Sequence, residues 1–126
     1  GANNIFSGEV REGDERTALI ATPQGAFRVP QRAGRPLASG AAATFVVGAD
    51  RIFPGEPTAG QSQVSGQVSG IEYVGATATI FLALPGGNEI RVQLPESDLE
   101  RAGIGVGSTL PVTWATDDAY VLPDTA

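Results

Sequence analysis

The sequence predicts an all-β protein made of two similar halves, and three observations carry that interpretation. The 126 residues include 17 Gly and 9 Pro, which separate short runs rich in Val, Ile, Thr and Phe. Within residues 88–94, Ile90, Val92 and Leu94 alternate with polar residues and lie on one face. The order of strand-like runs and turn residues in the first half recurs in the second.

The repeat begins with Ser-Gly-x-Val, at Ser7 and again at Ser65. After each opening, the sequence continues with a bend, a β-prone run and a turn that starts with Pro. A strand that ends in Pro and a last strand pair follow. The corresponding strands are predicted at residues 17–22, 26–30 and 43–53, and at residues 77–84, 89–95 and 109–122. We therefore predict a tandem duplication, with halves at residues 1–57 and 64–126 joined by a small, polar linker at residues 58–63.

About five short strands in each half are the inventory of a small, partly open barrel, of which the OB-fold is the common form. Each barrel would be marginal alone, so we expect the two to pack together or to share strands. A short helical turn is predicted near residues 96–102. Ser97 and Glu100 form a candidate capping box at its start, and Gly103 is suited to close its end.

The composition excludes several kinds of chemistry. Without His and Cys, the chain cannot supply a Ser-His triad or the common zinc ligands. Without Lys, it cannot supply a Walker A loop. The Asp117-Asp118 pair is interpreted as a solvated turn, because neighbours on a strand point to opposite faces. We expect a non-catalytic chain with no metal and no cofactor, and the absence of Met, even at position 1, suggests a piece of a longer protein.

Several segments resemble a known family. They are residues 68–75 (Val-Ser-Gly-Ile-Glu-Tyr-Val-Gly), the Pro-Gly-Gly turn, residues 105–114 (Gly-Val-Gly-Ser-Thr-Leu-Pro-Val-Thr-Trp) and residues 117–122 (Asp-Asp-Ala-Tyr-Val-Leu). In this order they resemble the TOBE domain. This is the small OB-like module at the C-terminus of ATP-binding subunits of bacterial ABC importers of the polyamine, iron(III) and sugar class.

The resemblance implies a regulatory and dimerisation domain separated from its ATPase domain. It implies a homodimer, with the parent ATPase domain and the transporter permease as partners and a small solute as a further one. The location implied is cytoplasmic, peripheral to the inner membrane through the transporter complex. The aromatic side chains expected near the dimer interface are Phe53, Tyr73, Trp114 and Tyr120.

Two alternatives stay open. The opening segment also resembles the molybdate-binding Mop module (Ser-Ala-Arg-Asn-x-Leu-x-Gly-x-Val), which Ala2, Asn4, Gly8 and Val10 match. That reading is a sensor of an oxyanion or solute, with ligand residues nominated as Ser65, Ser69, Thr77 and Arg91. The other alternative is an OB-type binder of single-stranded nucleic acid, with Trp114 and the two Tyr stacking on bases. A net charge of −6 without a basic stripe argues against it.

Overall fold

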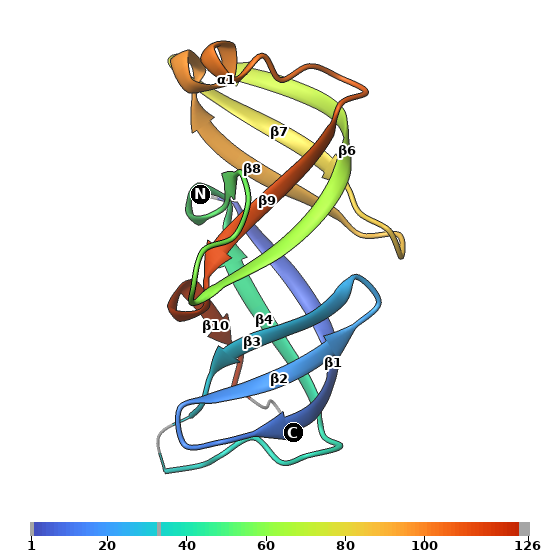
Figure 1. Ribbon diagram of the computed structural model, residues 1–126, viewed down its shortest axis with the longest axis vertical. Coiled ribbons are helices and arrows are strands. Elements are labelled where there is room, and N and C mark those ends of the chain that lie inside the picture. Colours follow the sequence, from blue (N-terminus) through green and yellow to red (C-terminus); the bar gives the residue numbers. More distant parts are fainter. Residues whose placement is uncertain (1, 33, 124–126) are drawn as a thin grey trace.

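The computed structural model describes residues 2–32 and 34–123, which form two five-stranded antiparallel sheets (Figure 1). The strand order is β10-β4-β1-β2-β3 in the first sheet and β5-β9-β6-β7-β8 in the second. The first sheet contains β1 (Asn3–Gly13), β2 (Thr17–Thr22), β3 (Gly25–Pro30), β4 (Ala42–Gly48) and β10 (Ala119–Val121). The second contains β5 (Phe53–Pro54), β6 (Gln61–Val74), β7 (Thr77–Ala83), β8 (Glu89–Pro95) and β9 (Thr109–Ala115). The predicted all-β, tandem fold is confirmed.

The two halves exchange their last strands. Strand β5, from the end of the first half, pairs with β9, and β10, from the end of the second half, pairs with β4. Short 3-10 helices precede these strands, η1 (Ala49–Arg51) and η2 (Thr116–Asp118), and the second coincides with the turn predicted at the paired Asp residues. Strand sharing between the barrels is therefore present. The division at residues 58–63 stays a prediction, since β6 already begins at residue 61 and strands on both sides of it pair with the opposite half.

The repeated Ser-Gly-x-Val opening lies where the first strand of each half crosses its neighbour. A Cβ built on Gly8 would lie 1.9 Å from the carbonyl oxygen of Ala21, and one on Gly66 would lie 2.6 Å from that of Ala83. Both strands then carry a β-bulge, between Val10 and Glu12 in β1 and at the corresponding place in β6. Because only Gly lets the backbones approach this closely, both long strands can bend across the barrel.

One hydrophobic core runs through both halves. It includes Trp114 of β9, which is fully buried and whose ring centroid lies 5.5 Å from that of Phe6 and 5.1 Å from that of Phe27. Phe6 in turn stacks on Phe45 at 5.1 Å. The three Phe belong to the first half, so the large apolar area of Trp114 is buried between the halves and stabilises their association.

A buried amide joins the halves at the edge of the second sheet. Asn4 is 5% exposed, and its Nδ2 donates to the carbonyl oxygen of Arg91 at 2.8 Å. Its Oδ1 accepts from the backbone N–H of Arg91 at 2.7 Å. The side chain thus pairs with strand β8 as a neighbouring strand would, and it satisfies both polar groups of Arg91 at an otherwise open edge.

The helix α1 (Glu96–Ala102) is present at the predicted position, but its start differs from the prediction. The predicted capping box is wrong, because Pro95 is the N-cap residue and no side chain caps the helix. The N–H of Glu96 instead donates to the carbonyl of Ala76 at 2.8 Å, so a tertiary contact satisfies this end. Gly103 ends the helix as predicted, with φ 66° and its N–H donating to the carbonyl of Glu100.

Candidate anion-binding pocket

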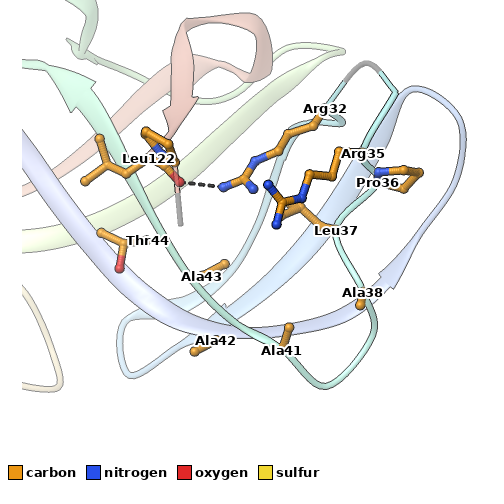
Figure 2. Close-up of a pocket in the computed structure, with 11 residues that line it drawn as sticks. Arg32, Arg35, Pro36, Leu37, Ala38, Ala41, Ala42, Ala43, Thr44 and Leu122 are labelled. Atoms are coloured by element: carbon orange, nitrogen blue, oxygen red, sulfur yellow. Dashed lines mark hydrogen bonds between the residues drawn. The ribbon is translucent and has the colours of Figure 1, made fainter. Parts of the chain in front are cut away.

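A pocket of about 460 Å³ opens on the first half, between the loop that joins β3 to β4 and the end of β10 (Figure 2). Its walls combine charged, apolar and backbone groups from three parts of the chain. The lining residues are Arg32, Arg35, Pro36, Leu37, Ala38, Ala41, Ala42, Ala43, Thr44, Leu122 and Pro123.

The loop is held by the side chain of Gln31. Its Oε1 accepts from the N–H of Leu37 at 2.7 Å and from the N–H of Arg32 at 3.2 Å. Its Nε2 donates to the carbonyl oxygen of Asp14 at 3.3 Å. Farther along, the N–H of Gly40 donates to the carbonyl of Val10 at 2.7 Å. The amide of Gln31 therefore replaces a strand partner and fixes the loop that presents the charged groups.

Two guanidinium groups face this pocket. Figure 2 shows Arg32 and Arg35 extending from the loop into the same space, on the side of β4. Arg32 donates to the carbonyl oxygen of Leu122, and none of the ion pairs between described residues includes Arg32 or Arg35. A guanidinium presents a planar set of donors that matches the oxygens of carboxylates and phosphates. Two such groups in one pocket favour a small oxyanion.

The far wall is supplied by the C-terminal segment. The N–H of Leu122 donates to the carbonyl of Thr44 at 2.9 Å, which extends the β10–β4 pairing by one residue. The hydroxyl groups of Thr44 and Ser7 form a hydrogen bond at 2.9 Å. Because β10 comes from the second half in sequence, the pocket is completed only when the exchanged strand is in place.

The corresponding connection in the second half has a different chemistry. It contains α1, whose Arg101 pairs with Asp98 at 3.3 Å. The first-half loop, residues 31–40, contains no acidic residue at all. The two connections therefore differ in charge as well as in secondary structure, and the first carries two Arg that form no ion pair within the described part of the chain.

Comparison with known proteins places the fold in a family. Residues 49–122, more than half of the chain, match the model of the family described as TOBE domain. The chain belongs to the TOBE domain family. No curated protein matches this TOBE chain over its sequence.

The solved structures extend the likeness to the first half. The TOBE chain superposes on the cytoplasmic molybdate-binding protein ModG, solved with molybdate bound, with a TM-score of 0.80 and 22% sequence identity. The match covers 95% of this chain and 96% of that one. At this identity the likeness shows the fold, which is the tandem, Mop-like arrangement of small barrels.

The ligand residues nominated from the sequence do not meet in this pocket. Ser65 lies on β6 opposite Pro111, and Thr77 lies at the first position of β7. Ser69 donates to the carboxylate of Glu89 at 2.9 Å, while Arg91 lines a separate, smaller pocket. Their role as ligands stays a prediction.

The aromatic residues nominated for an interface fall into two groups. Phe53, Tyr73 and Tyr120 are more than half exposed, whereas Trp114 is fully buried inside the chain. Trp114 therefore contacts the other half of its own chain, and its ring is not accessible for stacking on a nucleic-acid base. The pairing of two chains stays a prediction.

Arg32 and Arg35 were missed because neither belongs to a recognised motif. The sequence offered only a local signal: two of the eight Arg fall in one four-residue stretch of a loop that contains no Asp or Glu.

Among the described residues, no group of three His, Cys, Asp or Glu could hold a metal ion. No helix in the described part of the chain is long and apolar enough to cross a membrane.

Proposed function

We propose that this TOBE-family chain is a non-catalytic binding module that holds a small oxyanion between Arg32 and Arg35. The observation that carries the proposal is the convergence of two guanidinium groups in one pocket, neither of which forms an ion pair with another described residue. The whole-chain likeness to a molybdate-binding protein supports the ligand class. Charge-assisted hydrogen bonds from both groups would hold the anion, in a chain whose overall net charge is −6.

Titration calorimetry with molybdate, sulfate and phosphate at low ionic strength tests the proposal. We expect at least one of them to bind, and the affinity to fall as salt is raised, because both cations lie near solvent. The variant Arg32→Gln/Arg35→Gln should bind the anion at least about tenfold more weakly, since each charged hydrogen bond contributes roughly 1.5–3 kcal/mol.

The matched control is Arg101→Gln, which removes a guanidinium from the corresponding connection of the second half. It should bind the anion as the unaltered chain does. Flat traces for all three anions, or equal binding by the double variant, would contradict the proposal.

We propose as a second candidate that the chain serves an importer ATP-binding subunit as its regulatory and dimerisation domain. The TOBE family match supports it, as does an apolar row across the outer face of the first sheet. Tyr120 lies opposite Val46, and Val46 lies opposite Ile5, with Tyr120 62% and Ile5 57% exposed. In this proposal the partners are a second copy, the ATPase domain and the permease, on the cytoplasmic side of the membrane.

Sedimentation across a wide concentration range tests this second proposal. We expect a two-fold dimer that dissociates in Ile5→Ser/Tyr120→Ser, because large exposed apolar side chains buried in an interface contribute most of its binding energy. The control Val74→Ser removes an exposed apolar residue at the tip of the β6–β7 hairpin. A monomer at every concentration would rule out the dimer.

A further inference from the structure

A second cavity, of about 210 Å³, lies at the junction of the two halves. Ala2 and Ala49 of the first half form one side, and the exposed face of strands β6, β7 and β8 forms the other. On this face the strand register places Glu72 beside Thr79, and Thr79 beside Gln93. The next row holds Phe81 beside Arg91. The cavity thus has a carboxylate on one strand and a guanidinium two strands away.

Arg91 is fixed in this cavity from two sides. Its backbone is held by the buried side chain of Asn4, and its guanidinium lies over the ring of Phe81, 5.4 Å from the centroid. The nearest acid along the strand, Glu89, accepts from the hydroxyl of Ser69 instead. A cation placed over an aromatic face keeps its outer donors free for a ligand.

The corresponding arginine of the first half is already occupied. Arg28 lies opposite Leu19 on β2 as Arg91 lies opposite Phe81 on β7. Arg28 bonds to the carboxylate of Glu12 at 3.0 Å and to the hydroxyl of Thr17 at 3.3 Å. No ion pair between described residues includes Arg91 or Glu72. The arginine at this sheet position therefore forms an ion pair in the first half, whereas in the second half it lies at a cavity that also contains the separate carboxylate of Glu72.

We infer that this cavity binds a small zwitterion, with its carboxylate on Arg91 and its ammonium on Glu72. Strands lie about 4.8 Å apart and alternate residues about 6.6 Å along a strand, which separates the two Cα atoms by roughly 12 Å. The two long side chains shorten that gap, but a ligand whose charges are several bonds apart spans it better than an α-amino acid. The hydroxyl of Thr79 and the amide of Gln93 lie between the charges and can bond to either end.

Amide chemical shifts of the ¹⁵N-labelled chain, titrated with 4-aminobutanoate, test the inference. We expect saturable shifts at millimolar ligand, concentrated at Glu72, Thr79 and Arg91. Butanoate and butylamine each lack one of the two charges and should bind at least about tenfold more weakly, because each lost charge removes a charged hydrogen bond. Glycine should bind more weakly than 4-aminobutanoate. No shift, or equal binding by butanoate, would overturn the inference.

Three variants sharpen the result. Arg91→Gln and Glu72→Gln should each weaken 4-aminobutanoate at least about tenfold, and the fold should persist because Asn4 holds only the backbone of Arg91. Arg28→Gln is the matched control in the other half and should leave binding unchanged. Unaltered binding by Arg91→Gln, in a chain whose spectrum remains that of the folded protein, would overturn the assignment of the site.

Discussion

The two halves have the same arrangement of strands, but they place different side chains at corresponding positions in the contact between them. Asn4 lies opposite Val47 in the first half, and the corresponding pair in the second half is Ser62 opposite Trp114. The first half thus supplies a buried amide that reaches out to β8, while the second supplies a buried indole that reaches into the aromatic cluster. Each half contributes one long-range contact that the other lacks, so the halves are complementary despite the repeat.

The surface connections differ more than the strands. Where β3 leads to β4, a loop carries Arg32 and Arg35, and where β8 leads to β9, a helix carries Arg101 already paired with Asp98. Strand positions are constrained by the bend, the bulge and the core, whereas a connection can change its charge at little cost in stability. Binding chemistry is therefore expected on the connections and on the outer sheet faces, where the two halves diverge.

The largest expected difference between the halves concerns Trp114 and Val47. Trp114→Ala should lower the free energy of unfolding by about 3–5 kcal/mol, because it leaves a large cavity between the halves. Val47→Ala removes only two methyl groups from the corresponding position and should cost about 2 kcal/mol. Urea unfolding of both variants measures the contrast. Equal losses would mean that Trp114 does not join the halves more strongly than an ordinary core residue.

The next contrast is between the two glycines of the bent strands. Gly8→Ala places a Cβ 1.9 Å from a backbone oxygen, a collision that requires β1 and β2 to separate and should cost about 3 kcal/mol. Gly66→Ala places its Cβ 2.6 Å from a backbone oxygen, a smaller overlap, so its cost should be about half as large. Thermal unfolding of the pair tests the order, which would be refuted if Gly66→Ala were the more destabilised.

A third contrast concerns the amide at the sheet edge. Asn4→Ala leaves the N–H and carbonyl of Arg91 without their partner and should cost about 1–3 kcal/mol. It should also speed hydrogen exchange at the Arg91 amide. Ser62→Ala, the corresponding change in the second half, should stay within about 0.5 kcal/mol. An Arg91 amide that exchanges at the same rate in both variants would show that Asn4 does not protect this edge.

The sequence predicts those features that local chemistry decides. Gly8 and Gly66, the turns that begin with Pro, and the alternation around Val92 each depend on a few neighbouring residues, so the strands and the duplication could be predicted. The capping box at Ser97 failed although its pattern was local, because Pro95 occupies the cap position and a contact with Ala76 satisfies the helix start.

The candidate sites depend on contacts between distant parts of the chain. Arg32 meets Leu122 across 90 residues of sequence, and Asn4 meets Arg91 across 87. Nothing in the neighbourhood of these residues indicates such partners, so local sequence patterns could not show which side chains meet at a site. The composition of the loop at residues 31–40 was the one local signal for the pocket, and it indicates positive charge without indicating where that charge points.

The smallest expected effect is a pH dependence of stability that comes from the tip of the β1–β2 hairpin and not from the tip of the β6–β7 hairpin. Asp14 accepts hydrogen bonds from the N–H groups of Thr17 and Arg16, both at 2.8 Å, and these bonds lower its pKa below the ordinary value of 3.8. The corresponding tip of β6–β7 turns through Gly75, at φ 60°, and has no acid. Since the folded pKa is depressed, the stabilisation by Asp14 is present above the ordinary pKa and is lost as pH falls through the folded value. The stability difference between the unaltered chain and Asp14→Ala should therefore shrink from about pH 6 to about pH 2. A difference that stays constant over this range would show that the carboxylate charge does not stabilise the turn.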